Sequence, residues 1–284
     1  MLLEFRFMNY KSFLEETTFS MTAAPKQKGL DYSLITVKNK GKVLKGLCSS
    51  VIYGPNAAGK TSVIGAMETF QSIVLRGNIR NYEDNSTANY ASRNLELIPN
   101  KSIDRSSPVE FFIDFIVDRF RIQYGIIIDL GLFLDAKHER KILSETLTVN
   151  DNLIFERKHP GQKGACLMVD ANKNVAAMFS KSAKADNVRA IRIALDSLDH
   201  EDLFLTNGFK LIFSQKLSNL ITNWLTNQFI VVYCSNAVQL ERRFNDPQKH
   251  SVYVSETINN AVSIFGVNAN PIKNIPQKRM LNRN

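Results

Sequence analysis

The chain has 284 residues, of which 44% are hydrophobic and 22% charged, and a net charge of +9. This composition is that of an ordinary globular protein with room for one large core or two modest ones. No segment approaches the roughly 18 uncharged apolar residues that cross a bilayer, which argues against a membrane partner. Cys48, Cys166 and Cys234 form no C-x-x-C pair, so we expect no disulfide framework, no zinc site and a cytoplasmic location.

The N-terminal segment reads as a pair of strands. Apolar and charged residues alternate from Leu3 to Phe7, which predicts a half-buried strand. The segment Glu15–Met21 predicts a second strand, which pairs with the first through a turn at Asn9–Phe13. The polar segment Ala23–Gly41 is then expected to be an exposed loop.

The most informative segment is Gly54–Ser62, because it follows the pattern G-x-x-x-x-G-K-[ST]. The run Gly46–Tyr53 before it ends in β-branched and aromatic residues, which predicts a strand. Apolar residues from Val63 to Val74 recur at helical spacing and predict a helix from Lys60 to about Arg76. A strand, a loop and a helix in this order are the context in which the pattern forms a phosphate-binding loop. The alternative is a glycine-rich turn with an incidental lysine.

Each residue type in this loop has a physical role. Glycines let the backbone curl, so that successive N–H groups converge on one anion, and the helix adds the positive end of its dipole. Lys60 would place a positive charge at the outer phosphates, and the Thr61 hydroxyl would coordinate magnesium. The predicted nucleotide-binding residues are Gly54, Pro55, Asn56, Ala57, Ala58, Gly59, Lys60, Thr61 and Ser62.

The middle of the chain predicts antiparallel strands. Residues 77–107 are rich in Asn, Ser, Asp and Arg and are interpreted as a long surface insertion. The runs Val109–Val117 and Phe120–Leu130 predict a hairpin with a two-residue turn, and Lys141–Val149 and Asn152–Arg157 predict another. Four antiparallel strands after the loop's helix depart from the strand–helix alternation of a simple doubly wound fold.

The second half of the chain is predicted to be mainly helical. Helices are expected over Arg189–Leu198, Leu211–Asn227 and Glu256–Phe265, and Phe229–Tyr233 is expected to be a buried strand. The fold class is therefore α/β. An antiparallel meander and the phosphate-loop strand share a core around the Lys60 helix within residues 1–175, and residues 176–284 form a mainly helical segment.

Three features together resemble a known family. They are the turn Asn9–Phe13, the loop Gly54–Ser62, and a hairpin that contains Val109–Phe111 and Tyr124–Asp129. The chain resembles the AAA-type, ABC-like ATP-binding proteins of bacterial abortive-infection and anti-phage operons, relatives of the overcoming-lysogenization-defect proteins and of chromosome-maintenance ATPase heads. The similarity covers residues 1–235 and implies a P-loop NTPase of the ABC-ATPase-like type.

The resemblance also assigns ligands and partners. It implies ATP and Mg²⁺ as cofactors, with Lys60 on the β- and γ-phosphates and Thr61 on the metal. Lys11 resembles a basic residue that lies near the nucleotide in such heads, and a solvated turn lysine is the alternative. The family also implies self-association or a partner chain, and an effector nuclease or toxin. The net charge leaves nucleic acid open as a further partner.

Parts of the family pattern are missing from this sequence. ATPases of this type carry a serine-containing signature segment, a switch residue and a Walker B strand that ends in Asp-Glu. The run Gly125–Asp129 ends in Asp, but Leu130 follows, so we interpret it as a meander strand. The chain is therefore expected to be an N-terminal part, truncated before the Walker B half.

Three functions follow from this pattern. The first is an NTP-dependent sensor or switch in a bacterial defence or DNA-related system, whose ATP hydrolysis needs the missing half or a partner, because water must be oriented as well as phosphate held. The second is a nucleotide-binding regulatory or scaffold module that never hydrolyses ATP. The third is a complete ATPase that recruits Asp129 or Asp199 as its carboxylate.

Overall fold

The computed structural model describes most of the N-terminal four fifths of the chain. The described residues are 1–24, 29, 31–39, 42–80, 95, 97–102, 105–132, 138–158, 166–169, 189, 193–194, 197–209 and 215–231. The chain divides into two compact units, Met1–Tyr233 and Cys234–Asn284. All described residues lie in the first unit, so the predicted helix Glu256–Phe265 lies outside them. No helix in the described ranges is long and apolar enough to cross a lipid bilayer.

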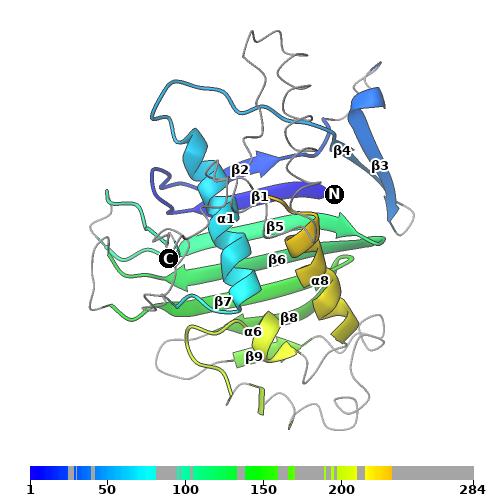
Figure 1. The fold of residues 1–284 in the computed structure, drawn as a ribbon. Coiled ribbons are helices and arrows are strands. Elements are labelled where there is room, and N and C mark those ends of the chain that lie inside the picture. Colours follow the sequence, from blue (N-terminus) through cyan, green and yellow to red (C-terminus); the bar gives the residue numbers. More distant parts are fainter. Residues whose placement is uncertain are drawn as a thin grey trace, which may run out of the picture. The chain divides into compact units, whose positions relative to one another are not determined.

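A seven-stranded sheet forms the centre of the first unit, in the order β2-β1-β5-β6-β7-β8-β9 (Figure 1). The strands are β1 (Leu2–Met8), β2 (Thr17–Ser20), β5 (Val109–Val117), β6 (Phe120–Asp129), β7 (Lys141–Val149), β8 (Asn152–Lys158) and β9 (Cys166–Val169). Every neighbouring pair is antiparallel. The N-terminal strand pair and both later hairpins are therefore confirmed.

Two tight turns set the register of the hairpins. Asp118 and Arg119 join β5 to β6, and Asn150 and Asp151 join β7 to β8. All four residues have positive φ, between 45° and 71°. Two-residue hairpin loops of this kind match the twist of the strands, and Asn and Asp tolerate positive φ better than most residues.

One face of the sheet packs against α1 (Lys60–Arg76), whose bounds agree with the prediction (Figure 1). Aromatic side chains make the central contacts. The Phe70 ring of α1 lies 5.7 Å from Phe5 of β1 and 6.0 Å from Tyr124 of β6, measured between ring centroids. Full burial of each such ring contributes about 1.5–3 kcal/mol, so the sheet and α1 form one core.

A second helix, α8 (Gln215–Asn227), covers the same face (Figure 1). Trp224 stacks on Phe115 of β5 with ring centroids 3.8 Å apart, and on Phe229 at 5.3 Å. The buried Gln71 amide of α1 donates hydrogen bonds to the carbonyls of Leu225 and Phe229. The predicted helix is thus confirmed from Gln215 onward.

The predicted buried strand Phe229–Tyr233 is wrong over its described part, Phe229–Val231, which has no strand structure. The Phe229 N–H donates to the carbonyl of Trp224, so the chain is still turning off α8 at this point. Ile230 is 47% exposed, which a buried strand would not allow.

Two predictions before α1 are also wrong. Within the expected loop Ala23–Gly41 the chain forms a short helix η1 (Asp31–Ser33) and β3 (Leu34–Asn39), which pairs with β4 (Lys42–Leu47) in a separate two-stranded sheet. The expected strand Gly46–Tyr53 stops at Leu47. Leu34, the first residue of β3, pairs with Leu47, and Ser33 before it belongs to η1, so β3 offers no further strand residue with which β4 could pair.

Part of the expected surface insertion 77–107 is packed into the core, whereas Lys101, Ser102, Arg105 and Ser106 are exposed. Ile79, Leu95 and Leu97 are at most 6% exposed and belong to the core, while residues 81–94 lie outside the described part. The Ile79 N–H donates to the Glu201 carbonyl, and the Gly77 carbonyl accepts from the Leu203 N–H. These bonds attach the end of α1 to the segment before α6 (Phe204–Asn207).

A buried carboxylate fixes that segment to the sheet. Glu145 of β7 is fully buried and accepts hydrogen bonds from the Tyr124 hydroxyl at 2.9 Å and from the N–H groups of Phe204 and Leu205 at 2.7 and 2.8 Å. The buried Arg157 guanidinium lies 3.7 Å away. Burial raises the pKa of Glu145, and Arg157 and the three donors only partly oppose this.

We expect Glu145→Gln to lower the free energy of unfolding by about 3 kcal/mol, because the amide replaces one acceptor oxygen by a donor that faces other donors. Urea denaturation measures this change. Glu156→Gln is the matched control, because Glu156 lies on neighbouring β8 with a half-buried side chain paired to Lys158. Loss of this ion pair should lower the free energy of unfolding by less than about 0.5 kcal/mol. Equal effects of the two substitutions would contradict the assignment.

Candidate functional site

The predicted phosphate loop lies between the end of β4 and the start of α1. Ala57 has φ 65° and Gly59 has φ 88°, so the backbone curls through the left-handed region twice before the helix begins. Gly59 is the N-cap of α1, and no side chain caps the helix. A glycine at this position allows the curl without a steric penalty.

The loop contacts the turn Asn9–Phe13, which follows β1. A Cβ atom on Gly59 would lie 2.8 Å from the Phe13 ring and 2.9 Å from the Ser12 hydroxyl, so only glycine fits here. The Ser12 and Ser62 hydroxyls are 3.3 Å apart, and the Tyr10 hydroxyl lies 3.0 Å from that of Thr69. Two motifs that are about 45 residues apart in the sequence are thus in direct contact.

Two buried asparagines hold this turn in place. The Asn9 side chain donates to the Ser107 carbonyl at 2.7 Å and accepts from the Asn100 N–H at 3.0 Å. Asn100 in turn donates to the Lys11 carbonyl at 2.9 Å, and the Lys11 N–H donates to the Ile98 carbonyl at 2.9 Å. The turn is therefore fixed from both sides before it meets the loop.

Free N–H groups gather where the loop joins α1. The Gly59 carbonyl accepts from the N–H groups of Ser62 and Val63. Within the described part of the chain, the N–H groups of Gly59, Lys60 and Thr61 have no acceptor. Unpaired N–H groups at a helix start carry the positive end of the helix dipole and attract anions.

The Lys60 ammonium lies on the loop itself. It donates to the carbonyls of Gly54 and Pro55, both at 2.7 Å. An ammonium has three donors, so one remains for another acceptor. The lysine therefore closes the curl and adds a full positive charge beside the free N–H groups of α1.

The loop is open to solvent on its other side. Residues 54–58 and Thr61 are exposed, so the predicted metal ligand is accessible. Val51, Ile52 and Tyr53, expected to form the end of a strand, have no strand structure and are 77%, 39% and 91% exposed. The predicted phosphate loop is therefore an exposed turn before α1, without the flanking strand that we predicted.

Lys11 belongs to the turn that contacts the loop. It has φ 49°, and its ammonium lies 5.4 Å from the centroid of the Tyr10 ring. The structure thus places Lys11 in the turn whose Ser12 and Phe13 contact Gly59, and its predicted position near a nucleotide stays a prediction. Sequence reasoning missed the contributions of Asn9, Ser12 and Phe13, although they belong to the same short motif, because the need for glycine at position 59 becomes visible only in three dimensions.

The carboxylates considered for a complete ATPase are engaged elsewhere. Asp129 accepts from the Ser106 hydroxyl at 3.1 Å and the Gly131 N–H at 3.0 Å, and its oxygen lies 3.0 Å from His138 Nε2. Burial raises the pKa of Asp129, but the combined effect of these three neighbours is larger, so the pKa lies below its ordinary value. Asp199 pairs with Arg80. In the described residues neither carboxylate contacts the loop.

We expect Gly59→Ala to lower the free energy of unfolding by at least about 1 kcal/mol, because the added Cβ meets Phe13 and the backbone stays left-handed. Ala57→Gly is the matched control, because it removes a Cβ at another left-handed position of the same loop. Its gain in backbone freedom in the unfolded state offsets the strain relieved, so we expect a change within about 0.5 kcal/mol. Thermal and urea denaturation measure both, and a neutral Gly59→Ala would refute the tight contact.

The chain matches no family model and no curated protein sequence. Its resemblance to ABC-like ATP-binding proteins therefore stays a prediction. Function has to be inferred from the residues of the loop and their geometry.

Proposed function

We propose that this protein binds ATP with Mg²⁺ at the loop Gly54–Ser62 and serves as an NTP-dependent sensor or switch in a bacterial defence or DNA-related system. One observation carries the proposal. The free N–H groups at the start of α1 lie beside the Lys60 ammonium, which rests on two loop carbonyls at 2.7 Å. Such an arrangement of main-chain donors with one cation suits a chain of phosphates.

The residues present fit the two cofactors. The N–H groups of Gly59, Lys60 and Thr61 would bind phosphate oxygens, and the third donor of the Lys60 ammonium would neutralise the outer phosphates. The exposed Thr61 hydroxyl would hold Mg²⁺, which supplies a compact positive charge when it is bound. The defence role and an effector nuclease or toxin are supported by the family resemblance alone.

Hydrolysis is proposed to need a partner. Phosphoryl transfer to water requires a group that orients the water, besides the groups that hold the phosphates. Among the described residues, the side chains of the turn that contact the loop, Ser12 and Phe13, offer a hydroxyl and an aromatic ring but no carboxylate. A second copy or another chain would bring that carboxylate beside the exposed run Val51–Tyr53, whose backbone makes no hydrogen bond to the described residues and is open to pairing with a strand.

The first test is isothermal titration calorimetry with ATP and Mg²⁺. We expect saturable binding that Lys60→Ala weakens at least about tenfold, because a charge-assisted hydrogen bond to phosphate is lost. Lys45→Ala on β4 is the matched control, because it removes an exposed lysine outside the loop and should leave the affinity unchanged. Absence of heat at millimolar ATP on folded protein would refute the proposal.

The second test separates the metal from the phosphates. We expect Thr61→Ala to weaken ATP binding when Mg²⁺ is present and to have little effect when it is chelated, because the hydroxyl acts on the metal. Ser62→Ala provides the control for loss of a neighbouring hydroxyl. ATP turnover of the purified chain then distinguishes the alternatives. Turnover that Lys60→Ala abolishes indicates a complete ATPase, and binding without turnover is what the proposal expects.

A further inference from the structure

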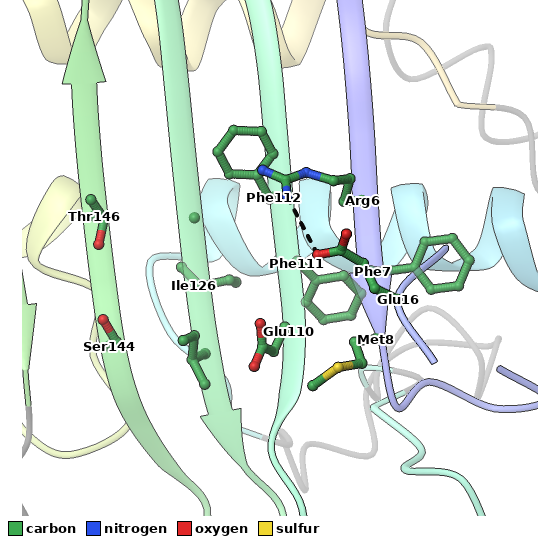
Figure 2. A pocket seen from close by; sticks show the side chains of 12 residues that line it. Arg6, Phe7, Met8, Glu16, Glu110, Phe111, Phe112, Ile126, Ser144 and Thr146 are labelled. Carbon is green, nitrogen blue, oxygen red and sulfur yellow. Dashed lines mark hydrogen bonds and ion pairs between the residues drawn. The ribbon is translucent and has the colours of Figure 1, made fainter. Parts of the chain in front are cut away.

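The sheet carries a hollow on the face that points away from α1 (Figure 2). It has a volume of about 280 Å³ and lies over the centres of β1, β5, β6 and β7. Figure 2 shows the labelled side chains of Arg6, Glu110, Phe112, Ser144 and Thr146 on these neighbouring strands. None of them belongs to the phosphate loop.

The strand register explains why these side chains meet. Arg6 of β1, Phe112, Gly125 and Thr146 lie directly opposite one another in one cross-strand row. The adjacent row consists of Met8, Glu110, Ile127 and Ser144. Residues two apart on a strand point to the same face, so both rows project from one side of the sheet.

A glycine creates the hollow. Gly125 has no side chain, and a Cβ atom there would lie 3.5 Å from the Phe112 ring, an ordinary contact distance. Nothing in the fold therefore requires glycine at this position, in contrast to Gly59. Because Gly125 has no side chain, its backbone forms the bottom of the hollow between the Phe112 ring and the Thr146 side chain, next to the aliphatic Ile127.

The positive charge in the hollow is already neutralised. The Arg6 guanidinium lies 2.8 Å from a Glu4 oxygen and 3.3 Å from a Glu16 oxygen, and 4.1 Å from the centroid of the Phe112 ring. Its charge is thus matched by two carboxylates, and one face of the guanidinium is used in the cation–π contact. An anionic ligand would find no free cation among these residues and would meet two carboxylates.

Glu110 is the group left for a ligand. Its half-buried carboxylate has no hydrogen bond or ion pair with the described residues. Burial, with the charge of nearby Glu16, raises its pKa, and Arg6 opposes this only in part. The lining side chains Arg6, Glu16 and Glu110 sum to one negative charge on a chain whose net charge is +9.

We propose that this pocket binds an organic cation, a guanidinium or ammonium group on a short apolar stem. The cation pairs with the Glu110 carboxylate, and the Ser144 and Thr146 hydroxyls accept hydrogen bonds from its remaining N–H groups. The stem lies on the Gly125 backbone between Phe112 and Ile127, which removes apolar surface from water. The site is independent of the proposed nucleotide function.

The test uses n-butylguanidinium as the probe and amide chemical shifts of Gly125 and Ile127 as the readout. We expect saturable shifts at these amides. n-Butylurea has the same shape without the charge and should give no saturation. Glu110→Gln should weaken binding about tenfold, since a charge-assisted hydrogen bond is lost. Gly125→Val should abolish binding by filling the hollow.

Glu156→Gln is the matched control, because Glu156 lies opposite Thr146 in the same row but outside the pocket, and it should leave the affinity unchanged. A capped arginine, acetyl-arginine methylamide, distinguishes the source of the cation. Tighter binding than n-butylguanidinium would assign the site to a protein side chain, and weaker binding to a free small molecule. Equal binding of n-butylurea, or unchanged binding by folded Glu110→Gln, would overturn the proposal.

Discussion

The contact between the turn Asn9–Phe13 and Gly59 is the constraint on which the loop depends. The loop has no strand beside it in the described structure, so its shape is set by this contact and by the Lys60 ammonium on its own carbonyls. A phosphate site needs N–H groups that already converge, because ordering them at the moment of binding would cost conformational entropy. Asn9 and Asn100 contribute to this order without contacting the loop, because their hydrogen bonds fix the segment Asn9–Phe13, which packs against Gly59.

Strand β1 connects the two faces of the sheet. Phe5 and Phe7 point into the core beneath α1, and the strand continues into the turn that supports the loop. Arg6, between them, points to the opposite face and covers one side of the Phe112 ring beside the pocket. Alternation along a single strand therefore separates the core face from the face that carries the pocket, while the end of the same strand leads to the turn beside the loop.

Sequence reasoning was reliable where the signals are local. The helix Lys60–Arg76 and the turns at 118–119 and 150–151 follow from periodicity and from short-range turn chemistry, and all are confirmed. It failed where contacts with residues far along the chain determine whether a segment forms a strand. Val51–Tyr53 has strand-forming residues but no described strand beside it, and Phe229–Val231 is held by Trp224 and Gln71 instead. The pocket could not be predicted, because it requires the register of four strands at once.

The exposure of Val51–Tyr53 bears on how the loop would work. Val51 and Tyr53, directly before the proposed phosphate loop, are 77% and 91% exposed, and full burial of an apolar side chain contributes about 1.5–3 kcal/mol. A strand laid against them would recover that energy and would also reach the open side of the loop, where a water-orienting carboxylate is needed. The same contact would then bury these apolar side chains and supply the carboxylate that hydrolysis needs. Association and hydrolysis would be coupled through one short segment. The proposed nucleotide binding would use the N–H groups at the start of α1, Lys60 and Thr61, and would not require the partner.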